Sequence, residues 1–136
     1  MITYDNPRPV AVMLVPIGED GLLVTLRGGH MIGGGKWALP GGFIDAGETW
    51  RVAGAREVLE ETGVVVSAET IEHVATDSTP DGQFVLIFGR TERIPTLPPF
   101  TENLETTAIK TIHAPTKLAF PLHTDAANLF FLTSKA

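Results

Sequence analysis

The sequence predicts an α/β fold in which a mixed β-sheet is flanked by helices. Short apolar, β-branched segments such as residues 10–17 recur along the chain and are separated by turn residues. Two segments with helical spacing begin at threonine caps, over residues 49–62 and 124–133. Strands and helices in this order pack most simply as a sheet that is covered on both faces.

The composition indicates one globular domain over residues 1–136 and limits its partners. Hydrophobic residues make up 43% of the chain and charged residues 19%, which predicts a packed core. The formal net charge of −6 argues against nucleic acid or an anionic membrane as the main partner, but a phosphorylated small molecule is compatible if metal ions carry the compensating charge. The absence of cysteine excludes disulfides, thiolate metal ligands and cysteine nucleophiles. No signal peptide or membrane span is evident, so we expect a cytoplasmic protein.

In the first half of the chain, local patterns predict an irregular lead-in, a hairpin, a glycine-rich loop and a helix. The lead-in is residues 1–8, and an acidic turn at 19–21 joins the hairpin strands. Residues 28–36 contain five glycines and predict a mobile loop. Strands are expected over residues 10–17, 22–26 and 43–45, with an extended piece and a tight bend over 37–42.

In the second half, strands are expected over residues 64–66, 71–76, 84–89 and 106–112. A turn at residues 79–82 joins two of these strands, and residues 95–100 form a proline-rich loop. Thr124 is the expected cap of the final helix, and Ala126, Leu129 and Phe130 are expected to dock it on the sheet.

Three acids crowd the helix expected over residues 49–62. Glu57, Glu60 and Glu61 share one sector of a helical wheel, and no lysine follows them at the i+4 position that a solvated helix usually offers. A divalent cation would offset their repulsion of roughly 0.2–0.5 kcal/mol per close pair. Oxygen ligands suit Mg²⁺ or Mn²⁺, whereas the alternative interpretation is a solvated acidic face.

The wheel also predicts which way this helix faces. Val52, Ala55 and Leu59 lie opposite the acids, so we expect these apolar side chains to face the core and the acids to point away from it. Gly54 lies beside the acids and costs roughly 0.5–1 kcal/mol relative to alanine in a helix. We interpret it as a small residue that leaves room for a ligand.

At this point the chain resembles a known family. The spacing of residues 42–64 is similar to the Nudix box, and the stretch 37–42 resembles the approach to that box. The fixed positions are filled by Gly42, Glu48, Arg56, Glu57, Glu60, Glu61 and Gly63, with aliphatic Val58 and Val64. The resemblance implies a Nudix-type α/β/α sandwich that hydrolyses a nucleoside diphosphate linked to another moiety, using Mg²⁺ or Mn²⁺.

The resemblance also implies roles for individual residues. The metal-binding and catalytic acids would be Glu57, Glu60 and Glu61, joined by the carbonyl of Gly41, and the general base is left open. Glu48 and Arg56 would pair and hold the loop against the helix. Some members add an acid from a later loop, and here the candidates are Glu102 and Glu105, for which plain surface acids are the alternative.

The substrate is less well determined by the sequence. Arg27 and Lys36 flank the glycine-rich loop and are candidates for phosphate contact, with plain surface residues as the alternative. Pro80 lies 16 residues after Val64, where ADP-ribose hydrolases of the family tend to have a proline. That favours ADP-ribose or a nucleotide sugar, although a turn at this point would also contain proline. The rival readings are a nucleoside triphosphate pyrophosphohydrolase and a non-catalytic nucleotide-binding sensor, and the resemblance is compatible with a homodimer.

The histidines show no metal-ligand spacing. His73, His113 and His123 are scattered along the chain, and we expect them to be structural.

Overall fold

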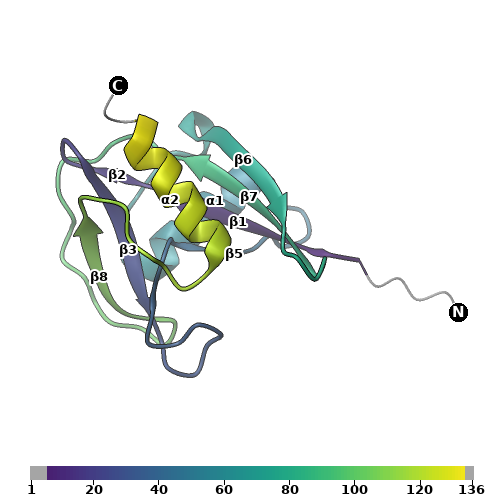
Figure 1. The fold of residues 1–136 in the computed structure, drawn as a ribbon. Coiled ribbons are helices and arrows are strands. Elements are labelled where there is room, and N and C mark those ends of the chain that lie inside the picture. Colours follow the sequence, from purple (N-terminus) through teal and green to yellow (C-terminus); the bar gives the residue numbers. More distant parts are fainter. Residues whose placement is uncertain (1–5, 134–136) are drawn as a thin grey trace, which may run out of the picture.

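Two β-sheets lie between two helices, which pack against opposite faces (Figure 1). The computed structural model describes residues 6–133, so most of the predicted lead-in lies outside the described residues. The elements are β1 (Arg8–Leu14), β2 (Pro16–Ile17), β3 (Gly21–Arg27), β4 (Trp37–Ala38), β5 (Gly41–Phe43), α1 (Trp50–Thr62), the 3₁₀ turn η1 (Ala68–Thr70), β6 (Glu72–Ser78), β7 (Phe84–Arg90), β8 (Thr106–Ile112) and α2 (Pro121–Thr133). Neither α1 nor α2 is long and apolar enough to cross a membrane.

The first sheet is mixed, with the order β5-β1-β7-β6. Strand β1 pairs parallel with β7 and antiparallel with β5. Side chains of a strand alternate between its two faces, and β1 shows this clearly. Val12 and Leu14 belong to the core under α2, whereas Ala11 and Met13 belong to the core under α1. This arrangement confirms the predicted α/β class, with a mixed sheet flanked by helices.

The second sheet is antiparallel and takes up the end of the first predicted strand. The chain leaves the first sheet after Leu14, and Pro16–Ile17 pair with β3 instead. Proline has no N–H to donate, so it is found at strand starts and edges rather than inside a continuous ladder. The hairpin predicted around residues 19–21 is therefore confirmed, but with the short β2 as its first arm. Strands β4 and β8 complete this sheet by pairing with β3.

The later strands agree with their local patterns, with one exception, and one earlier strand is shifted. Strands β6, β7 and β8 confirm three of the predictions. The strand predicted over residues 64–66 is wrong: Val64 and Val66 are buried and Val65 is exposed, but no neighbouring strand pairs with them in the described structure. The strand predicted over 43–45 instead covers Gly41–Phe43. Glycine has a low strand propensity, so the two glycines of this segment do not indicate a strand.

Helix α2 begins at Pro121, three residues before the predicted start. Proline fits the first turn of a helix, where its missing N–H has no partner to lose. Thr124 is therefore not the cap; its hydroxyl accepts a hydrogen bond from the N–H of Leu118 at 2.9 Å. The side chains that dock the helix are Ala126, Ala127, Phe130 and Phe131, whereas Leu129, expected in the core, is 43% exposed.

Helix α1 is rotated relative to the wheel prediction: of the three apolar side chains expected in the core, Ala55 packs against it and is partly buried. Val52 and Leu59, expected in the core, are 47% and 50% exposed. Glu57 and Glu61 are buried instead, together with Ala53, Gly54 and Val58. Two of the three acids therefore point into the protein.

Close packing against β1 explains the glycine at position 54, which the sequence did not reveal. A Cβ atom on Gly54 would lie 2.6 Å from Cε and 2.7 Å from Sδ of Met13 on β1. Since real Cβ atoms do not approach other atoms so closely, glycine lets α1 lie directly on the sheet. The interpretation that Gly54 leaves room for a ligand is therefore wrong, because Met13 fills that space.

Candidate active site

Helix α1 presents Glu57 and Glu61 on the same side, one turn apart. The helix starts at Thr49, whose hydroxyl accepts a hydrogen bond from the N–H of Val52 at 3.2 Å, and it ends at Gly63 with φ 78°. Residues four apart on a helix lie above one another. Both carboxylates consequently face strand β5, where the N–H of Gly41 donates to Oε2 of Glu61 at 2.9 Å.

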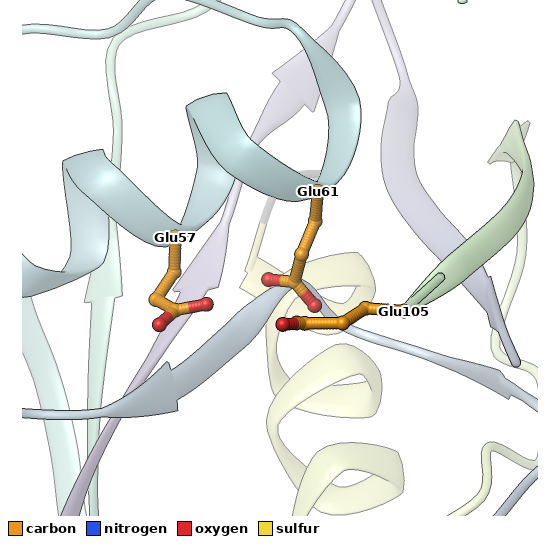
Figure 2. A group of neighbouring side chains, drawn as sticks. All are labelled: Glu57, Glu61 and Glu105. Carbon is orange, nitrogen blue, oxygen red and sulfur yellow. The ribbon is translucent and has the colours of Figure 1, made fainter. Parts of the chain in front are cut away.

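A third acid reaches the same place from the loop before β8. Figure 2 shows the side chains of Glu57, Glu61 and Glu105 converging. One carboxylate oxygen from each of them can be chosen so that all three lie within 4.8 Å of one another. Three hard oxygen donors at this separation are a suitable ligand set for a divalent cation. Of the two candidates for the extra acid, the structure brings Glu105 into the group, and Glu102 is not part of it.

Asn103 connects the loop of Glu105 to the end of α1, and sequence reasoning missed it. Its Oδ1 accepts hydrogen bonds from the N–H groups of Glu105 and Thr106 at 3.1 and 3.0 Å. Its amide nitrogen donates to the carbonyl of Glu61 at 3.4 Å. Asparagine commonly makes local turns of this kind, so the available signal was an Asn two residues before a candidate acid.

Burial and mutual repulsion make the charged forms of these acids unfavourable when no cation is bound. Burial raises the pKa of Glu61 well above its usual range, and the neighbouring Glu57 raises it further. Burial also raises the pKa of Glu57, although Arg56 opposes this. A bound cation would remove the repulsion between the acids and favour their charged forms.

Glu60, the third predicted acid, lies apart from this cluster. Its side chain is 53% exposed, and its Oε2 accepts a hydrogen bond from Nη1 of Arg56 at 3.2 Å. The acids that the structure brings together are thus Glu57, Glu61 and Glu105, with Glu60 on the rim.

Arg56 and Glu48 are in contact, as the family resemblance implies. Nε and Nη2 of Arg56 donate to the two oxygens of Glu48 at 2.7 and 2.8 Å, and Nη2 also donates to the carbonyl of Phe43 at 3.1 Å. These hydrogen bonds lower the pKa of Glu48 to about 2. Because Nη1 donates to Glu57 at 2.9 Å as well, the guanidinium ties the loop after β5 to a cluster acid.

Two adjacent glycines in β5 allow these close approaches for different reasons. A Cβ atom on Gly42 would lie 2.5–2.7 Å from the carboxylate atoms of Glu57. A Cβ atom on Gly41 would lie 2.4 Å from the carbonyl oxygen of Ala11 on β1. Gly42 therefore makes room for the carboxylate, and Gly41 makes room for the sheet.

This geometry can be compared with known proteins. A family model described as the NUDIX domain matches residues 7–130. The chain belongs to the NUDIX family. A MutT-like protein of Streptomyces ambofaciens is 38% identical over 79 residues, which are 58% of this chain and 49% of that protein. The chain thus spans about half the length of this curated relative.

Two solved structures resemble the fold over most of the chain. A NUDIX hydrolase from Nitrosomonas europaea has a TM-score of 0.78 and 29% identity, covering 97% of this chain and 74% of that one. A bifunctional NMN adenylyltransferase/ADP ribose pyrophosphatase from Francisella tularensis, complexed with AMP and a manganese ion, has a TM-score of 0.67 and 27% identity, covering 82% of this chain and 35% of that one.

Arg27, one of the residues predicted to contact substrate in this NUDIX chain, lies near the acids. Its charge interacts with Glu61 and Glu105. Its guanidinium lies 5.1 Å from the ring centre of Phe120, and its Nε donates to the carbonyl of Ile32 at 2.7 Å. Desolvation by burial lowers the pKa of Arg27, but these acids oppose that shift. An arginine held in this way is a fixed positive charge beside the cluster.

The structure does not bring Lys36 and Pro80 into the cluster. Both are exposed: Lys36 ends the glycine-rich loop, and Pro80 lies in the turn between β6 and β7. Lys36 is tied to Arg27 through the backbone, since its carbonyl accepts the N–H of Arg27 at 3.0 Å. No contact in the described residues joins either side chain to the acids, so their substrate roles stay predictions.

A pocket of about 530 Å³ lies between the glycine-rich loop and the loop of Glu105. Its lining consists of Gly28, Gly29, His30, Glu102, Asn103, Leu104 and Thr107. The two loops are joined where the N–H of Gly28 donates to the carbonyl of Glu105 at 2.9 Å. Because Asn103 lines the pocket and also donates to the carbonyl of Glu61, the pocket lies beside the end of α1 that carries the acid cluster.

Proposed function

We propose that the protein hydrolyses the diphosphate of a nucleoside diphosphate linked to a further group, ADP-ribose or a nucleotide sugar, with Mg²⁺ or Mn²⁺. The observation that carries the proposal is the convergence of Glu57, Glu61 and Glu105 within 4.8 Å. NUDIX family membership supports hydrolysis of this bond class. The Francisella relative, whose name includes an ADP ribose pyrophosphatase, supports the substrate class.

The residues of the site fit a divalent cation. Glu57, Glu61 and Glu105 would hold it together with the carbonyl of Gly41, and Glu60, which lies outside this group, could join only if its side chain moved towards it. When bound, the cation would activate a water and neutralise charge on the phosphates. The N–H of Gly41 holds the carboxylate of Glu61 in place.

Positioning and charge compensation fall to the two arginines. Arg56 holds Glu57 through a 2.9 Å hydrogen bond and keeps the loop after β5 against the helix. Arg27 offers a positive charge beside the acids, where a diphosphate oxygen would otherwise meet only carboxylates. Fixed charges of this kind favour an anionic substrate without further rearrangement.

The neighbouring pocket favours a sugar over a third phosphate. Its lining includes His30 and the acid Glu102 but no lysine or arginine, so a phosphate would meet a carboxylate and no permanently charged side chain of opposite sign. The free hydroxyls of a sugar can instead donate to this carboxylate and to backbone carbonyls. This observation is why we rank ADP-ribose and nucleotide sugars above nucleoside triphosphates.

A substrate panel tests the proposal. We expect kcat/KM for ADP-ribose or a nucleotide sugar to exceed that for nucleoside triphosphates by about tenfold or more, a difference of about 1.4 kcal/mol. The panel should also include NADH and dinucleoside polyphosphates, each with Mg²⁺, with Mn²⁺ and with a chelator. A preference for nucleoside triphosphates would support the pyrophosphohydrolase alternative. Nucleotide binding without turnover of any substrate would support the sensor.

The raised pKa values of Glu57 and Glu61 predict a pH dependence. Protons compete with the cation for these oxygens, so Mn²⁺ affinity should fall as pH falls through the raised pKa of Glu61, and binding should release protons. Without metal, the folded state holds more protons than the unfolded state above the ordinary glutamate pKa, so stability should fall as pH rises there. Calorimetry in buffers of different ionisation enthalpy, with denaturant titrations at each pH, measures both effects. Proton-independent binding would contradict this assignment of ligands.

A further inference from the structure

Residues 39 and 40 form a buried link between the two sheets. Strand β4 before the link pairs with β3, and β5 after it pairs with β1. The carbonyl of Pro40 accepts the N–H of Met13 at 2.9 Å. The next residue, Gly41, donates its N–H to Glu61. The way this link is held therefore decides where the backbone of Gly41 lies relative to the acid cluster.

Helix α2 holds this link through His123. This residue is 6% exposed, and its Nδ1 accepts the N–H of Leu39 at 3.2 Å. Its ring packs edge-on against Phe88 and Phe120, with centroid separations of 6.1 and 4.9 Å. Burial lowers the pKa of His123 to about 3, which keeps the imidazole neutral so that one ring nitrogen can accept.

We propose that His123 is a positioning residue for Gly41, acting through the link over residues 39 and 40. By accepting the N–H of Leu39 it fixes the link, and it thereby orients the amide of Gly41 against Glu61 and directs the carbonyl of Gly41. The inference rests on the proposed metal site. It goes beyond core packing, because a leucine or phenylalanine could fill the same space but could not accept a hydrogen bond.

The contacts of its neighbours Phe120 and Ala119 also connect His123 to the acid cluster. Phe120, against which the His123 ring packs, also lies under the guanidinium of Arg27. One residue earlier, the N–H of Ala119 donates to the carbonyl of Trp37 at 2.7 Å. The segment just before α2 thus contacts both β4, which leads into the link, and Arg27 beside the acids.

A matched pair of substitutions separates the hydrogen bond from packing. His123→Asn places an oxygen as many bonds from Cα as Nδ1 of histidine, whereas His123→Gln moves it one bond further. Both lose the ring, so their losses of packing are similar. Phe131→Leu is the control, since Phe131 is 3% exposed and lies about two turns further along α2.

Three measurements on these variants test the proposal. Mn²⁺ affinity is measured by electron paramagnetic resonance, amide exchange of Leu39 by NMR, and the free energy of unfolding by denaturant. We expect His123→Gln to weaken Mn²⁺ binding about tenfold, as is usual when a group that orients a metal ligand is lost, and to speed exchange at Leu39. His123→Asn should stay within about threefold of the unsubstituted protein, on the same scale of ligand-orienting effects. Phe131→Leu should lose stability but keep its affinity.

The possible outcomes test the positioning role of His123 and the metal site separately. Unchanged Mn²⁺ affinity in His123→Gln, or an equal loss in Phe131→Leu, would overturn the positioning role while leaving the metal site intact. A lack of Mn²⁺ binding by the unsubstituted protein would overturn the proposed metal site and this inference with it. If His123→Gln does not fold, the unsubstituted protein suffices: Mg²⁺ should slow exchange at Leu39, and unchanged exchange would overturn the role.

Discussion

Glu61→Gln is expected to lower metal-dependent turnover about 10³-fold, because a bound metal contributes several kcal/mol to catalysis of this kind. Glu61 is 3% exposed and lies between the N–H of Gly41 and the carboxylates of Glu57 and Glu105. Glutamine keeps an oxygen that can accept the N–H of Gly41, so the local backbone should not move. What the substitution removes is the negative charge that a cation needs.

Stability measurements distinguish this explanation from a simple folding defect. Because burial raises the pKa of Glu61, the charge is unfavourable without metal, and Glu61→Gln should fold at least as stably as the unsubstituted protein under those conditions. Added Mg²⁺ should raise Tm of the unsubstituted protein but not of the variant.

Glu69→Gln is the matched control for this substitution. Glu69 is an exposed acid on η1, so its loss should change neither activity nor the response to Mg²⁺. Full activity in Glu61→Gln would show that this carboxylate does not hold the metal.

Local patterns predicted those elements whose partners are close in sequence. Strands β6 and β7 are joined by the turn at 79–82, and their alternation and turn residues are all local. The ends of α1 agree with Thr49 as cap and Gly63 as terminator, because both act within the helix itself. Spacing alone therefore placed the acids on a helix.

The face of α1 could not be predicted from the helix alone. The wheel treats Val52 and Leu59 as core residues because they are apolar, yet both are largely exposed. Glu61 is buried because it faces a strand that begins with two glycines, where its carboxylate accepts a hydrogen bond from the N–H of Gly41. Burial of a charged group depends on such a partner, and the partner lies 20 residues away.

The remaining site residues depend on contacts over longer distances in the chain. His123 and Leu39 are 84 residues apart, and no periodicity connects them. Glu102 and Glu105 looked equivalent in sequence, but Asn103 turns the loop so that Glu105 reaches the cluster. A choice between two acids in one loop requires the backbone conformation of that loop, which its composition does not specify.

Gly42→Ala is expected to weaken Mn²⁺ binding by about 10- to 100-fold, the range seen when groups that orient metal ligands are disturbed. The added Cβ would lie 2.5–2.7 Å from the carboxylate of Glu57. That carboxylate is the end of a flexible side chain, so it can swing away, and in doing so it leaves the cluster. The φ of Gly42 is not positive, so alanine can adopt its backbone conformation, and stability should change by less than about 1 kcal/mol.

Gly41→Ala provides the contrast that makes this prediction specific. Its Cβ would meet the carbonyl oxygen of Ala11 at 2.4 Å, and a backbone atom in a central strand cannot swing away. This variant should therefore lose about 1–3 kcal/mol of stability through overpacking. Adding Glu57→Asp to Gly42→Ala shortens the acid by one methylene and should restore part of the Mn²⁺ affinity. If Gly42→Ala binds Mn²⁺ as tightly as the unsubstituted protein, the carboxylate of Glu57 does not hold the cation from the position that it has in this structure.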